Sequence, residues 1–233
     1  MNQFVLAFPI PVAVDEPFAI TETVQVNADT KTLMIPGCSV QFNVVRQGAS
    51  ADLLEIFKER DEISAEEEAA IVDHKSLLFL LGNVKTMDDV EMVNSAIVKV
   101  LNAKAAGVYM QQSGTAWTAK AFEEQFGDCD YAMDPWINIL DSGDSLYTLG
   151  LAVFTLPDLC ISNTIEDPEE ALLMAADSLF GDGIPAKSGS VIDWGEGEKY
   201  AYNLNKQGDN TQPCHTPFPI WNQSVVTSGS VIS

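Results

Sequence analysis

Positive charge is scarce in this chain of 233 residues. It contains 12 Lys and Arg against 34 Asp and Glu, which gives a formal net charge of −22 at pH 7. Such a surface repels the phosphates of nucleic acids and the anionic headgroups of membranes. We therefore expect no direct nucleic-acid binding and no membrane association, and we expect any macromolecular partner to be a basic protein.

Long apolar runs and cysteine pairs are missing as well. No stretch reaches the roughly 18 apolar residues of a membrane helix, and the first residues contain no basic segment typical of a signal peptide. The four cysteines (Cys38, Cys129, Cys160 and Cys214) form no CxxC pair. These absences predict a soluble, cytoplasmic protein whose cysteines are free thiols.

Common catalytic motifs are also absent. The sequence has no GxSxG, GxxxxGK[ST], HExxH or GxGxxG pattern, and its only histidines are His74 and His215. We interpret His74 as a structural residue that ties a helix end to a strand, with a catalytic base as the alternative. His215 follows Cys214, and adjacent residues of an extended chain point to opposite sides, which disfavours a nucleophile–base pair. The sequence thus favours a protein without catalytic activity or cofactor.

Apolar periodicity predicts an α+β fold, with a mixed β-sheet and helices packed mainly on one face. The apolar segment 76–81 is typical of a buried central strand, and Met87–Lys104 of an amphipathic helix. We predict one domain over residues 1–204 and a Pro-containing, weakly structured tail over 205–233, with an added strand at 224–227 as the alternative. Further strands are expected at 4–8, 18–26, 32–35, 39–45, 107–109, 136–140, 146–156, 159–162, 190–194 and 199–204, and further helices at 51–59, 64–72, 118–127 and 167–180.

The distribution of charge is the most unusual feature of the sequence. Between Lys120 and Lys187 there is no Lys or Arg, and the 66 residues of this gap hold 14 acids. Three interpretations fit: a solvated surface that confers solubility, a docking face for a basic protein, or a divalent-metal site. The docking interpretation assigns partner binding to Glu123, Glu124, Asp128, Asp130, Asp134, Asp141 and Asp144.

The metal interpretation depends on Asp128, Asp130 and Asp134, which place three carboxylates within seven residues. Carboxylate oxygens suit hard cations, but the positions that follow do not match a calcium-binding EF-hand loop, because its glycine and its final glutamate are replaced by Met133 and Ile139. A metal-assisted hydrolase that uses these three acids therefore stays an alternative to docking. A protein that mimics DNA, with carboxylates in place of phosphates, is a third possibility.

The order of several segments is similar to a known family. His74–Leu81 is followed by an amphipathic helix, then by Ala106–Tyr109 and Ser113-Gly114, and later by Thr148–Leu151 and Leu156–Leu159. Together these segments resemble the bacterial family called domain of unknown function 4261, over roughly residues 70–192. The resemblance implies an α+β fold and no catalytic residue, and some relatives look like components of bacterial conflict systems. It agrees with a protein that binds and inhibits or neutralises a basic partner, in an immunity or inhibitor role.

Overall fold

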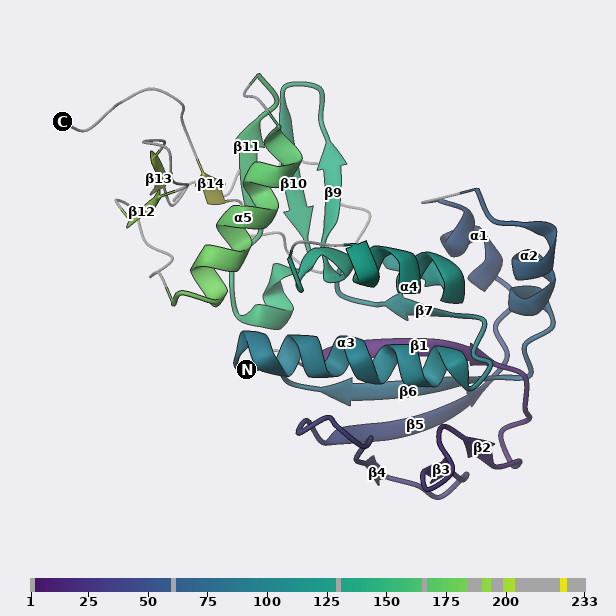
Figure 1. Ribbon diagram of the computed structural model, residues 1–233. Helices are drawn as coiled ribbons and strands as arrows, with labels where there is room; N and C mark the ends of the chain where they lie inside the picture. Colours follow the sequence, from purple (N-terminus) through teal and green to yellow (C-terminus); the bar gives the residue numbers. More distant parts are fainter. Residues whose placement is uncertain are drawn as a thin grey trace. The chain divides into compact units, whose positions relative to one another are not determined.

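The computed structural model describes residues 3–59, 62–128, 131–164 and 167–183, and the backbone of three short strands beyond residue 189 (Figure 1). The chain divides into two compact units, residues 1–135 and 136–233, so the boundary predicted at residue 204 does not coincide with this division. Each unit contains a six-stranded sheet and at least one helix, which confirms the α+β class. The division falls within a short 3-10 helix, η1 (Asp134–Trp136), where no Gly- or Ser-rich linker marks it in the sequence.

The sheet of the first unit is antiparallel throughout. Strands β1 (Phe4–Ile10) and β6 (Ser76–Gly82) are paired along their whole length at its centre, from Phe4 opposite Gly82 to Ile10 opposite Ser76. The predicted mixed sheet occurs only in the second unit. The strand order in the first unit is β4 (Thr32–Leu33), β5 (Phe42–Gly48), β6 (Ser76–Gly82), β1 (Phe4–Ile10), β7 (Gly107–Met110) and β8 (Thr115–Thr118).

One face of this sheet carries the main core. Helices α3 (Met87–Asn102) and α4 (Ala119–Asp128) lie in contact with each other and with β7. Residues two apart on a strand share a face, and Phe4, Leu6 and Phe8 of β1 are all buried. Burial of each such side chain contributes about 1.5–3 kcal/mol, so the two helices are held mainly by apolar packing.

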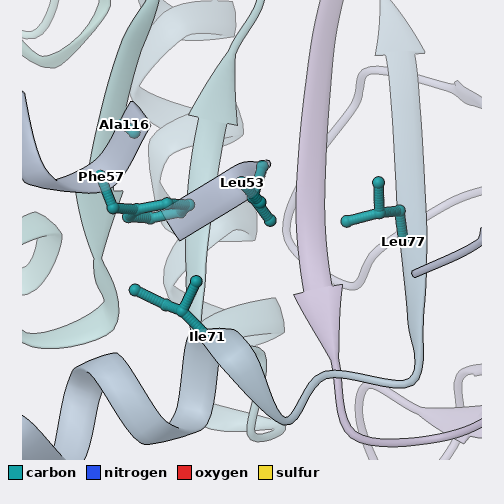
Figure 2. Close-up of a cluster of buried hydrophobic side chains, with 5 residues drawn as sticks. All are labelled: Leu53, Phe57, Ile71, Leu77 and Ala116. Atoms are coloured by element: carbon teal, nitrogen blue, oxygen red, sulfur yellow. The ribbon is translucent and has the colours of Figure 1, made fainter. Parts of the chain in front are cut away.

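The other face carries a smaller cluster near one end (Figure 2). Helices α1 (Leu53–Lys58) and α2 (Ala65–Val72) contribute Leu53, Phe57 and Ile71, which pack with Leu77 and Ala116 of the sheet. Helix α2 starts with the predicted capping box: the Ser64 side chain accepts the Glu67 N–H, and the Glu67 carboxylate accepts the Ser64 N–H.

The second unit contains a sheet with one parallel pair, between β11 (Leu159–Ser162) and β14 (Gln223–Val225). Helix α5 (Pro168–Phe180) packs against β10 and β11, and Phe154 lies between the rings of Trp136 and Phe180, with centroid distances of 6.1 and 5.1 Å. The strand order is β12 (Ser190–Asp193), β13 (Lys199–Asn203), β14 (Gln223–Val225), β11 (Leu159–Ser162), β10 (Ser145–Leu149) and β9 (Asn138–Asp141).

Three elements differ from the sequence-based expectation. The strand expected over 18–26 is a hairpin of two short strands, β2 (Phe18–Ala19) and β3 (Gln25–Val26). Strand β8 was not predicted. The strand expected over 146–156 ends at Leu149, because Gly150 adopts a φ of 117° and turns the chain into the 3-10 helix η2 (Leu151–Phe154).

Two further expectations concern cysteines and membranes. Cys38 and Cys160, the cysteines within the described ranges, are free thiols. Among the helices that the structure describes, none has both the length and the apolar character needed to cross a bilayer. Most of the predicted tail 205–233 lies outside the described residues, with the exception of β14, close to where the added strand was the alternative.

Candidate partner-binding surface

Helix α4 presents the first two predicted acids. Thr118 caps the helix, since its Oγ1 accepts the Ala121 N–H at 3.2 Å, and Phe122 is fully buried on the inner side. Glu123 and Glu124 are exposed on the helix. Glu124 lies 3.7 Å from the Lys120 ammonium, with both side chains largely exposed, and such a pair contributes less than about 1 kcal/mol.

Asp134 has a different environment from the glutamates. Its Oδ2 accepts a hydrogen bond from Nε2 of Gln125, on α4, and the side chain is half-buried. This carboxylate therefore holds the turn after α4 against the helix. Asp128 is the last residue of α4, but its side chain and the whole of Asp130 lie outside the described residues.

Of the three carboxylates that the metal alternative requires, the structure describes the side chain of Asp134 alone. Within the described ranges, no group of three or more His, Cys, Asp or Glu side chains is placed so that it could hold a metal ion. Asp134, which the alternative requires as a ligand, is engaged with an amide of its own unit.

Asp141 and Asp144 lie on the β9–β10 hairpin of the second unit. The Asp141 Oδ1 accepts the Gly143 N–H at 2.6 Å, which stabilises the turn, and Gly143 adopts a φ of 94° that favours glycine. Ser142 donates its N–H to the Ser145 carbonyl at 3.0 Å and closes the hairpin. Both acidic side chains are exposed. The predicted surface is thus divided, with five of its acids in the first unit and two in the second.

The cations within the described residues form few ion pairs with acids. Among the described residues there are two ion pairs, Lys120–Glu124 and Lys58–Glu68. Arg46 donates from Nη2 to the Ala13 carbonyl at 2.8 Å, and burial lowers the pKa of its guanidinium. Lys99 donates to the Pro36 carbonyl. Because these two cations bind backbone oxygens, they form no ion pair with the carboxylates of the surface, and of the exposed acids of the surface that the structure describes Glu124 alone is ion-paired.

His74 is placed by hydrogen bonds to the backbone at both ring nitrogens. It is 6% exposed, its Nδ1 lies 2.6 Å from the Ile71 carbonyl, and its Nε2 accepts the Ser50 N–H at 3.1 Å. A backbone N–H can only donate, so Nε2 carries no proton and Nδ1 donates to the carbonyl. The ring joins the end of α2 to the segment before α1, and neither nitrogen is left to accept a proton from a substrate.

Asp158 was not among the predicted site residues, although its pKa is the most perturbed. Its Oδ1 accepts the Leu151 N–H at 3.1 Å and the Thr148 hydroxyl at 3.4 Å, and Thr148 in turn accepts the Leu159 N–H at 2.8 Å. Burial raises the pKa of Asp158 from 3.8 to about 7, against the effect of these donors. The sequence feature that could have identified Asp158 was a single acid within the segment Leu156–Leu159.

The arrangement around Asp158 stabilises its own segment. Its hydrogen-bond partners are the backbone of Gly150 and Leu151 and the side chain of Thr148, which come from β10 and the start of η2. Such a carboxyl changes its charge near neutral pH, and it couples the stability of this unit to pH.

Comparison with known proteins adds no relative: no family model, no curated protein and no solved structure matches this chain. The resemblance to the domain of unknown function 4261 family therefore stays a prediction.

Proposed function

We propose that this chain is an acidic binding protein that engages and inhibits a basic partner protein. The observation that carries the proposal is the exposure of Glu123, Asp141 and Asp144, none of which forms an ion pair in the described structure. Carboxylates that form no internal ion pair keep their full attraction for an external cation.

The electrostatics support the same proposal. With a net charge of −22, the chain attracts cations over distances comparable to the Debye length, which is about 10 Å at 0.1 M salt. A field of this kind raises the association rate with a basic protein by about 10- to 1000-fold, and it repels acidic competitors. Selectivity for one basic protein then depends on where the carboxylates lie. This dependence can be tested by neutralising the same number of acids at different positions of the chain.

The test compares two variants of equal net charge. The first neutralises Glu123, Glu124, Asp141 and Asp144 by Glu→Gln and Asp→Asn substitution. The second neutralises four exposed acids elsewhere in the first unit: Glu22, Asp29, Glu55 and Glu91. Each protein is immobilised and exposed to a bacterial lysate at about 0.1 M salt and at about 1 M salt, where the Debye length falls to about 3 Å.

We expect the wild type and the second variant to retain the same basic protein at low salt, and the first variant to lose it. The retained protein is then purified, and its own activity should fall when the wild-type chain is added. Retention of no basic protein at low salt, or equal retention by both variants, would contradict the proposal. Competition of the chain with DNA for that partner would point instead to DNA mimicry.

A further inference from the structure

Strand β9 forms one edge of the sheet in the second unit. It pairs with β10 on one side, and in the described part of the chain no strand pairs with its other side (Figure 1). The unpaired backbone groups of an edge strand form a template for a further strand.

The register identifies which backbone groups point outward. The bond from the Ser142 N–H to the Ser145 carbonyl marks a hydrogen-bonded pair, and such pairs alternate along an antiparallel ladder. Leu140 is therefore bonded to β10, whereas Ile139 and Asp141 direct their N–H and C=O groups away from it. The bond from the Asn163 N–H to the Asp144 carbonyl lies on the other side of β10. It agrees with this alternation, in which successive residues bond to opposite neighbouring strands.

The other edges of the two six-stranded sheets are less suitable for an added strand. Strand β4 has two residues, and all four residues of β8 are buried. The side chains of β12 lie outside the described residues. In β9, by contrast, the residues 138–140 are half-buried and Asp141 is exposed, and the strand contains neither proline nor lysine to block pairing.

We propose that an extended segment of the basic partner adds to the outer edge of β9 and places a Lys or Arg opposite Asp141. This inference rests on the proposed function and identifies one contact within it. Residues opposite each other on adjacent strands have Cβ atoms about 4.5–5.5 Å apart, within reach of an ion pair. Ile139 shares a face with Asp141, so the partner residue two positions from the cation is apolar.

Charge favours a cationic segment over a second copy of this chain. No Lys or Arg occurs between Lys120 and Lys187, so a β9–β9 pair would bring two uncompensated Asp141 and Asp144 sets together. Like charges directly opposite on adjacent strands destabilise the pairing.

The experiment uses a short synthetic peptide in which threonine alternates with valine and lysine, so that valine and lysine share one face. A second peptide has the same sequence and charge but carries N-methyl groups on alternate amides, which removes its donors to β9. Calorimetry with the full chain at low salt should show the methylated peptide binding at least about tenfold more weakly, because two or more backbone hydrogen bonds are lost.

The matched variants are Ile139→Pro and Ile139→Val. The Ile139 N–H points outward, so proline removes a donor to the partner and leaves the ladder with β10 intact, as is usual for proline on edge strands. We expect Ile139→Pro to bind the unmodified peptide about tenfold more weakly than Ile139→Val, which keeps the N–H and an apolar side chain. If the proline variant does not fold, the two peptides on the wild type still decide the matter.

The outcomes separate the two proposals. If both peptides bind equally and in a salt-dependent way, pairing at β9 is wrong but the acidic docking surface stands. If neither peptide binds at low salt, pairing at β9 is wrong, and the retention experiment with the four-acid variants decides separately on the acidic docking surface. If the wild type forms a dimer that Ile139→Pro abolishes, a second copy occupies this edge, and the partner segment proposed here is wrong.

Discussion

The carboxyl of Asp158 should make the second unit less stable as the pH rises through neutrality. Its pKa is raised from 3.8 to about 7, chiefly by burial. When the folded pKa of an acid lies above the unfolded value, stability is highest below the unfolded pKa and falls as the pH rises through the folded one. The whole difference corresponds to about 4 kcal/mol, of which about 2–3 kcal/mol falls between about pH 5 and about pH 8.5.

The substitution Asp158→Asn removes this titration and keeps the shape of the side chain. The Leu151 N–H and the Thr148 hydroxyl can still donate to the amide oxygen. Urea unfolding at both pH values should show the wild type losing about 2–3 kcal/mol more than the variant. Hydrogen exchange over residues 150–159 should report the same difference locally.

The matched control for this experiment is Asp144→Asn, which removes an exposed acid of the same unit. It should keep the pH dependence of the wild type. Equal loss of stability in the wild type and in Asp158→Asn between the two pH values would refute the reasoning, because it would mean that burial does not raise the pKa of this carboxyl.

Three other predictions concern the first unit. Replacing Glu67 with Ala should lower the free energy of unfolding by about 1–2 kcal/mol at neutral pH, and urea titrations should show a smaller loss as the pH falls through the folded-state pKa, because hydrogen bonds from Ser64 and Thr118 lower the pKa of this carboxylate. His74→Ala leaves the half-buried Ser50 N–H without its ring acceptor and removes one donor to the Ile71 carbonyl, and thermal unfolding should reveal a loss of about 1–3 kcal/mol. Gly107→Ala should destabilise by about 1–3 kcal/mol or more, since its Cβ would lie 2.5 Å from a backbone oxygen, whereas Gly48→Ala, with open space around it, should unfold like the wild type in differential scanning calorimetry.

Several elements were predictable because their signals are local. The capping box at Ser64 and the apolar spacing of Met87–Asn102 depend on neighbours within one or two helical turns. The doubly apolar pattern of Ser76–Gly82 predicted a buried central strand for the same reason. Strand β8, which was not predicted, lies between a turn and the first residue of α4. Its four residues are too few to show an alternating apolar pattern distinct from that of the helix.

For the candidate surface, the sequence predicted the excess of acidic residues but not how their side chains are placed. The gap without Lys or Arg is plain in the sequence, but the outward direction of Glu123 and the half-burial of Asp134 depend on which face of α4 packs inward and on a bond from Gln125.

Composition and short-range periodicity therefore identified the α+β class, most of the helices and strands, and the sign of the charge, since each depends on residues close together along the chain. Packing over long range determined the rest. Examples are the division at residue 135, the raised pKa of Asp158 and the position of β9 at the edge of its sheet among the described strands. Each of these depends on contacts between segments far apart in sequence, whose burial and hydrogen bonding no local pattern encodes.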